Sequence, residues 1–144
     1  MRLIRQRNEV DCGLAVAAMV AGRSYRAATF ADPQPYIWRG LSLRDMQTTL
    51  SALETPSTIS RPRRPPELRD WPIATCARAL LIRPGGRRFG HWIATIADYV
   101  FDPELGAKVR LSGYDRADWL VIAVLSPTSP TSARTFHRRF TFAN

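Results

Sequence analysis

A stretch rich in proline and arginine, residues 55–72, divides this chain into two parts of different character. Proline lacks a backbone N–H and breaks helices, and it fits poorly into the centre of a sheet. Before this stretch, apolar residues recur at helical spacing. After it, short β-prone segments are separated by Gly, Pro and Asp. Helices first and strands second predict an α+β fold, with N-terminal helices packed on a C-terminal antiparallel sheet.

Two helices and five strands are expected. Residues 12–22 predict a buried, alanine-rich helix with Asp11 as its N-cap and Gly22 as its stop. Residues 43–54 predict a second helix that begins after Ser42. The predicted strands are 77–83, 91–96, 99–101, 107–111 and 119–125.

The chain length of 144 residues fits one compact core. We expect one domain over residues 1–126, followed by a basic segment, 127–144, that forms either a loose tail or an edge strand. The apolar run 14–21 is much shorter than the roughly twenty residues of a membrane span. It also does not resemble a secretory signal, so a cytoplasmic location is expected.

The formal charge of +9 raises the question of a nucleic-acid partner. The arginines are dispersed, however, and no recognised nucleic-acid motif accompanies them, so we do not expect one. The two cysteines are too few for a disulfide scaffold. No CxxC or HxxxH spacing occurs, so neither a metal nor a cofactor is expected.

Cys12 is a candidate nucleophile because it occupies the first turn of the first predicted helix. Unpaired backbone N–H groups and the helix dipole favour a thiolate over a thiol there. Gly13, beside it, is expected to let a substrate backbone approach closely. The alternative is that Cys12 is only a small apolar residue of a buried helix. Cys76 has no helix terminus to activate it and is expected to be structural.

The run Gln6-Arg-Asn-Glu-Val-Asp-Cys-Gly13, followed by a helix of small residues, resembles the opening of the bacteriocin-processing peptidases. These are papain-like domains that cut leader peptides after a double glycine. The resemblance implies a papain-like cysteine peptidase fold. It also implies that Gln6 donates a side-chain N–H to an oxyanion hole, beside the backbone N–H of Cys12.

His91 and Asp102 are the candidate base and its orienter. His91 begins an apolar strand, and Asp102 opens Asp102-Pro-Glu-Leu-Gly106, which is similar to the family's turn after its aspartate. If residues 97 and 98 form a two-residue turn, Ile96 faces Tyr99, and His91 and Asp102 become diagonal neighbours on one face.

A three-residue turn would place Asp102 on the opposite face of the sheet. Asp98 is then the fallback orienter, although it better suits the turn itself. Asp102 can also be a plain Asp-Pro turn residue. The other histidine, His137, lies in the polar tail.

The sequence therefore predicts a papain-like cysteine peptidase that acts on a peptide or protein substrate through Cys12, His91 and Asp102. The residues before the scissile bond are expected to be small, such as Gly-Gly. Tyr36, Trp38 and Trp92 can narrow the channel or belong to the core. The alternatives are a catalytically idle relative that binds peptides, and a transferase that passes the acyl group to an amine.

Overall fold

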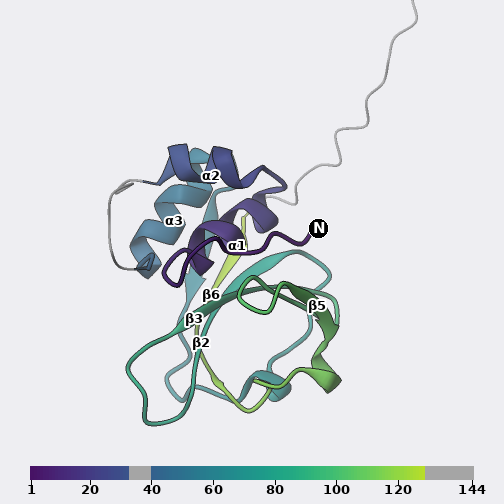
Figure 1. Ribbon diagram of the computed structural model, residues 1–144. Coiled ribbons are helices and arrows are strands. Elements are labelled where there is room, and N and C mark those ends of the chain that lie inside the picture. Colours follow the sequence, from purple (N-terminus) through teal and green to yellow (C-terminus); the bar gives the residue numbers. More distant parts are fainter. Residues whose placement is uncertain (33–39, 129–144) are drawn as a thin grey trace, which may run out of the picture.

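The computed structural model describes residues 1–32 and 40–128. Within these residues the chain is an α+β structure of three α-helices, two short 3₁₀ helices and one six-stranded antiparallel sheet (Figure 1). The strand order is β1-β6-β2-β3-β4-β5. The helices are α1 (Cys12–Ala21), α2 (Tyr25–Ala31) and α3 (Leu43–Ala52), and the 3₁₀ helices are η1 (Leu68–Asp70) and η2 (Leu111–Gly113). The strands are β1 (Ser57–Ser60), β2 (Arg78–Arg83), β3 (His91–Ile96), β4 (Tyr99–Asp102), β5 (Ala107–Arg110) and β6 (Leu120–Pro127).

The three helices gather on one side of the sheet, so the general α+β arrangement is confirmed (Figure 1). Almost every residue of α1 is buried, because its small alanine side chains let neighbouring elements approach from several directions. Gly22 ends α1 in the left-handed conformation, as expected, and Ser42 and Asp45 form a capping box at the start of α3.

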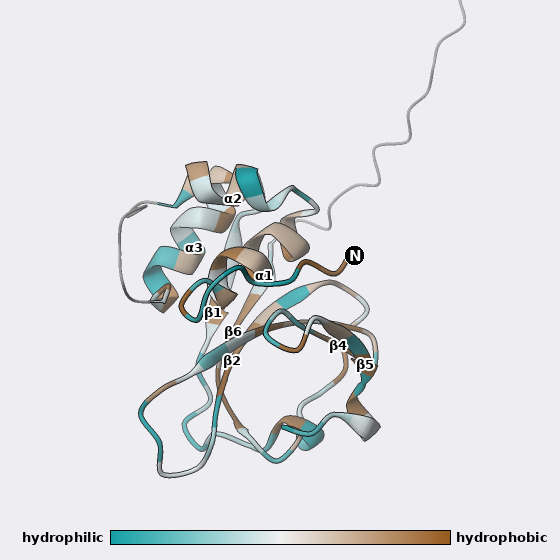
Figure 2. Ribbon diagram, viewed as in Figure 1, coloured by the Kyte–Doolittle hydropathy of each residue, from teal (hydrophilic) through white to brown (hydrophobic). Residues whose placement is uncertain are grey.

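The sheet carries an apolar cluster on each of its two faces. Trp92, Ala94 and Phe101 belong to the cluster beneath the helices. Ile93 and Val100 belong to the cluster on the other face, which η1 and the loops around it cover. The alternation of side chains along β3 and β4 therefore fills both cores. Figure 2 shows apolar stretches, in brown, in α1 and along strands of the sheet.

One α-helix and one strand, besides the two short 3₁₀ helices, were not predicted from the sequence. α2 is only seven residues long and lacks an apolar repeat, although Ser24 caps it. β1 lies inside the proline-rich stretch and pairs with β6 at the edge of the sheet, where neighbouring prolines are tolerated. β6 continues to Pro127, one residue beyond the expected end of the domain. The rest of the predicted basic tail, from residue 129, lies outside the described residues.

Two expected roles near the nucleophile are corrected. The Asp11 side chain does not cap α1; its carboxylate accepts hydrogen bonds from the backbone of Arg7 and Asn8 and from the Tyr25 hydroxyl. Gly13 is buried and, unlike Cys12, does not line an open cleft. A Cβ at this position would lie 3.0 Å from the Cβ of Leu41, so Gly13 permits close packing. No helix in the described part of the chain is long and apolar enough to cross a membrane.

Candidate active site

An open cleft of about 780 Å³ lies where the N-terminal segment, the beginning of α1 and the loop before β3 meet. Gln6, Cys12 and His91 all line this cleft. The structure therefore brings the predicted nucleophile, base and oxyanion donor to one cavity. Asp102 lies behind them, with no exposed surface.

The β3–β4 hairpin has the register expected from the sequence. Ile96 pairs with Tyr99, which leaves Ala97 and Asp98 as a two-residue turn. Ala97 adopts a positive φ of 50°, as such tight turns often require. His91 and Asp102 consequently share a face, and His91 Nε2 lies 2.9 Å from Asp102 Oδ1.

Four groups besides His91 donate hydrogen bonds to the Asp102 carboxylate. The backbone N–H groups of Glu104 and Leu105 reach Oδ1 at 2.9 and 3.3 Å. The Tyr114 hydroxyl and Arg116 Nη1 reach Oδ2 at 2.5 and 3.5 Å. Burial alone would raise the pKa of Asp102, but the hydrogen bonds from His91 and Tyr114 lower it to about 2. Asp102 is thus a fixed negative charge beside the imidazole.

The His91 imidazole is held between Asp102 and Cys12. Burial alone would lower the pKa of His91. Hydrogen bonding and charge attraction involving Asp102 and Cys12 outweigh it and raise this pKa to about 9. Since Nε2 is engaged by Asp102, Nδ1 is the ring nitrogen left for the Cys12 sulfur. This arrangement favours an imidazolium ion at neutral pH.

Cys12 is buried but not sealed: 8 % of its surface is exposed, and it lines the cleft. It is the first residue of α1, so its backbone N–H has no acceptor within the helix. Cys12 is therefore accessible from the cleft, although little of the residue is exposed.

Gln6 is half-buried on the cleft wall beside the turn that carries Asp102. Its backbone N–H donates to the carbonyl oxygen of Pro103 at 2.9 Å. Its side-chain Nε2 donates to the carbonyl oxygen of Asn8 at 2.8 Å. An amide nitrogen carries two hydrogens, so a second donor is left for a ligand in the cleft.

Three polar residues of the site were not found from the sequence: Glu104, Tyr114 and Arg116. Arg116 Nη1 pairs with Glu104 Oε2 at 2.7 Å, and the same oxygen lies 3.8 Å from His91 Nδ1. Glu104 belongs to the turn Asp102-Pro-Glu-Leu-Gly106, so its closeness to Asp102 in the sequence could have indicated a place in the site. Tyr114 and Arg116 follow η2, and no local pattern relates that segment to Asp102.

His91, Asp102 and Glu104 also offer three potential metal ligands within 4.8 Å of one another. Both Asp102 oxygens and Glu104 Oε2 already accept hydrogen bonds, and the Arg116 guanidinium contacts both carboxylates. A cation would have to compete with that positive charge. The arrangement therefore favours an ion-paired histidine over a metal centre.

The other residues considered from the sequence lie outside this site or outside the described residues. Asp98 is in the turn and pairs with Arg110 at 2.7 Å, so it does not orient His91. Cys76 is exposed, which corrects the expected structural role. Trp92 is a core residue whose Nε1 donates to the carbonyl oxygen of Leu41. Tyr36, Trp38 and His137 lie outside the described residues.

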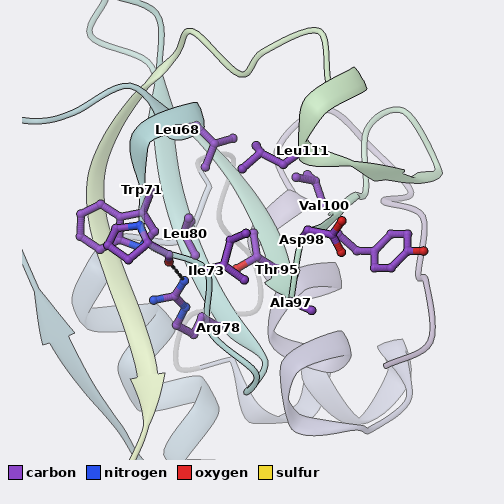
Figure 3. A pocket seen from close by; sticks show the side chains of 12 residues that line it. Leu68, Trp71, Ile73, Arg78, Leu80, Thr95, Ala97, Asp98, Val100 and Leu111 are labelled. Atoms are coloured by element: carbon purple, nitrogen blue, oxygen red, sulfur yellow. Dashed lines mark hydrogen bonds between the residues drawn. The ribbon is translucent and has the colours of Figure 1, made fainter.

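A second hollow lies on the face of the sheet that carries Leu80 and Val100 (Figure 3). Trp71 and Arg78 line one side of it, and Thr95 of β3 also lines it. Its volume of about 20 Å³ admits a water-sized molecule but no peptide side chain. The cleft at Cys12 is therefore the better candidate for a substrate site.

A scan against protein-family models and a search of curated proteins found no match to this chain. The function proposed below rests on the geometry of the cleft and on the motif around Cys12.

Proposed function

We propose that this protein is a papain-like cysteine peptidase, related to the bacteriocin-processing peptidases, with Cys12 as nucleophile, His91 as acid and base, and Asp102 as the orienting residue. The observation that carries the proposal is the position of His91. One ring nitrogen lies 2.9 Å from the fully buried Asp102 carboxylate, and the imidazole also interacts with Cys12 at an open cleft.

In the proposed reaction the Cys12 thiolate attacks the peptide carbonyl carbon, and the carbonyl electrons move onto oxygen. Gln6 Nε2 and the backbone N–H of Cys12 stabilise this oxyanion. His91 then gives its proton to the leaving nitrogen as the C–N bond breaks, which leaves a thioester on Cys12. His91 next removes a proton from water, which hydrolyses the thioester and releases the acid.

Cys76 provides an internal standard for testing the nucleophile, because it is an exposed cysteine outside the cleft. Iodoacetamide should label Cys12 faster than Cys76 at neutral pH, and His91→Ala should slow labelling at Cys12 only. Peptide mapping by mass spectrometry separates the two sites. Equal rates at both cysteines, independent of His91, would overturn the proposed chemistry.

Peptide cleavage separates the peptidase from its two rivals. The wild-type chain should cleave peptides with small residues before the scissile bond, and Cys12→Ala should not. An idle relative would bind such peptides without cleaving them. A transferase would give an amide with an added amine in preference to the free acid, because both reactions use the same thioester.

A further inference from the structure

The walls of the cleft are rich in arginine. Four arginines and two glutamates line it. Arg116 is neutralised by Glu104 at 2.7 Å and by Asp102 at 3.5 Å. Among the described residues, no carboxylate forms an ion pair with the remaining three arginines, Arg5, Arg7 and Arg87. Among the described residues Glu9 forms no ion pair either, so three arginines and one glutamate leave an excess of positive charge beside the reacting groups.

Two of these arginines flank Gln6 in the chain. The Arg5 side chain packs over Gly106, where a Cβ would lie 3.1 Å from Arg5 Cδ. The Arg7 guanidinium lies 4.3 Å from the centre of the Tyr25 ring. Both side chains are thus supported by neighbours. Ordered guanidinium groups lose less conformational entropy when they bind a carboxylate than free ones do.

The third arginine lies in the loop that leads directly into His91. Arg87 is exposed in this loop, and Phe89 nearby is 88 % exposed. Both residues line the cleft. This wall therefore offers an apolar surface beside a positive charge, a combination that suits a peptide carrying acidic and apolar side chains.

We propose that the cleft selects peptides with acidic side chains close to the cleaved bond, which are recognised by Arg5 and Arg7 on the N-terminal segment and by Arg87 on the loop before His91. This selectivity rests on the proposed peptidase function. These three arginines line the cleft but are exposed to solvent, so their charges stay partly hydrated when they attract a carboxylate. The preference should therefore weaken as salt increases.

Binding tests the selectivity separately from turnover. Three fluorescein-labelled peptides share a Gly-Gly core and differ only in the flanking residues, which are Glu, Gln or Lys. Fluorescence anisotropy with Cys12→Ala, which cannot cleave them, should show the Glu peptide binding about tenfold more tightly than the Gln peptide, and the Lys peptide binding most weakly. Arg5→Glu and Arg87→Glu should each weaken binding of the Glu peptide by about threefold to tenfold.

Arg61→Glu is the matched control, because Arg61 is exposed and does not line the cleft. It should leave the preference unchanged. Equal binding of the three peptides, or an equal effect of Arg61→Glu and Arg87→Glu, would overturn the proposal. So would displacement of the Glu peptide by a single-stranded oligonucleotide at lower concentration than by unlabelled Glu peptide.

Cleavage by the wild-type chain then tests the chemistry. If it cleaves all three peptides equally, the acidic preference is wrong and the peptidase proposal stands. If the Glu peptide binds best but none is cleaved and Cys12 is unreactive, the recognition is supported and the peptidase proposal fails.

Discussion

At the scale of single residues, the position of Asp102 decides what His91 can do. Oδ1 accepts from His91 and from two backbone N–H groups, whereas Oδ2 accepts from Tyr114 and Arg116. The two oxygens thus have different partners. An asparagine at this position can keep its oxygen toward His91 and place its NH₂ on the Tyr114 side, where the hydroxyl can accept. Only the contact with Arg116 at 3.5 Å is lost, and Arg116 keeps its bond to Glu104.

Asp102→Asn should therefore keep much of the geometry while removing the negative charge. A histidine whose pKa is raised keeps its proton to higher pH, so the alkaline limb of kcat/KM should lie near pH 9 in the wild type. Without the charge this limb should move down toward the ordinary value of 6.5. The pH–rate profile checks the shift, and an unmoved limb would contradict the assigned role.

Gln6 should affect the rate more than substrate binding. Gln6→Ala removes a proposed oxyanion donor, so kcat should fall about 10²–10³-fold with little change in KM. Gln47→Ala is the control, because Gln47 Nε2 also donates to a backbone carbonyl, that of Ser57, but away from the cleft. Equal effects of the two substitutions on kcat would contradict the oxyanion role.

At the scale of elements, the beginning of α1 is fixed by its contact with Leu41. Atoms of the Leu41 side chain lie only 3.0–3.1 Å from a Cβ placed at Gly13. The carbonyl oxygen of Leu41 also accepts a hydrogen bond from Trp92 Nε1 at 2.9 Å. Helix α1, which carries Cys12, thus packs against the loop at Leu41. That loop is hydrogen-bonded to Trp92 of β3, the strand that also carries His91.

Gly13→Ala should consequently destabilise the protein, although alanine is the better helix former by about 1 kcal/mol. Overpacking against Leu41 should lower the free energy of unfolding by about 1–3 kcal/mol. Leu41→Ala should relieve part of this cost in the double variant, because it removes Cγ and Cδ1 but keeps the Cβ. Gly113→Ala, which has open space around it, should stay within about 0.5 kcal/mol of wild type. Urea denaturation compares these variants with the Leu41→Ala single variant and the wild type. A Gly13→Ala variant as stable as wild type would contradict the packing.

The elements differ in how well their sequences predict them. The strand bounds 91–96 follow from an apolar run between Gly90 and a turn, and the two-residue hairpin follows from alternation. The partners of Asp102 do not follow in this way. Tyr114 and Arg116 reach it through tertiary packing, which leaves no local pattern.

The contrast between local pattern and tertiary packing also explains why β1 and the role of Asp11 were not predicted correctly. The prolines around β1 argued against a helix and against a central strand, so no strand was predicted there. Pairing with β6 at the sheet edge makes a short strand compatible with them. Asp11 has the right residue type and position for an N-cap. Its carboxylate instead accepts hydrogen bonds from the preceding loop and from Tyr25, and that choice depends on where α2 packs.

At the scale of the whole molecule, the pair His91–Asp102 couples stability to pH. The pKa of Asp102 falls from 3.8 to about 2 on folding, so its contribution is present above pH 3.8 and is lost as the pH falls toward 2. The pKa of His91 rises from 6.5 to about 9, so its contribution is present below pH 6.5 and is lost as the pH rises through 9.

Stability should accordingly be highest between about pH 4 and 6.5 and decline on both sides. Urea unfolding of the wild type and of Asp102→Asn across this range measures the effect. The variant should be less stable in the plateau and should decline less on both sides. A parallel curve for the two proteins would contradict the assigned coupling.

The hydrogen bond from Gln6 to Pro103 joins two segments that the ribosome produces far apart in time. Cys12 precedes His91 and Asp102 in the chain, so the ribosome makes the sulfur before the imidazole and its carboxylate partner. A nascent chain thus carries its thiol long before the groups that complete the site. On the proposed mechanism, a fragment that ends before residue 91 lacks the base and its orienting carboxylate, so it should not cleave peptides.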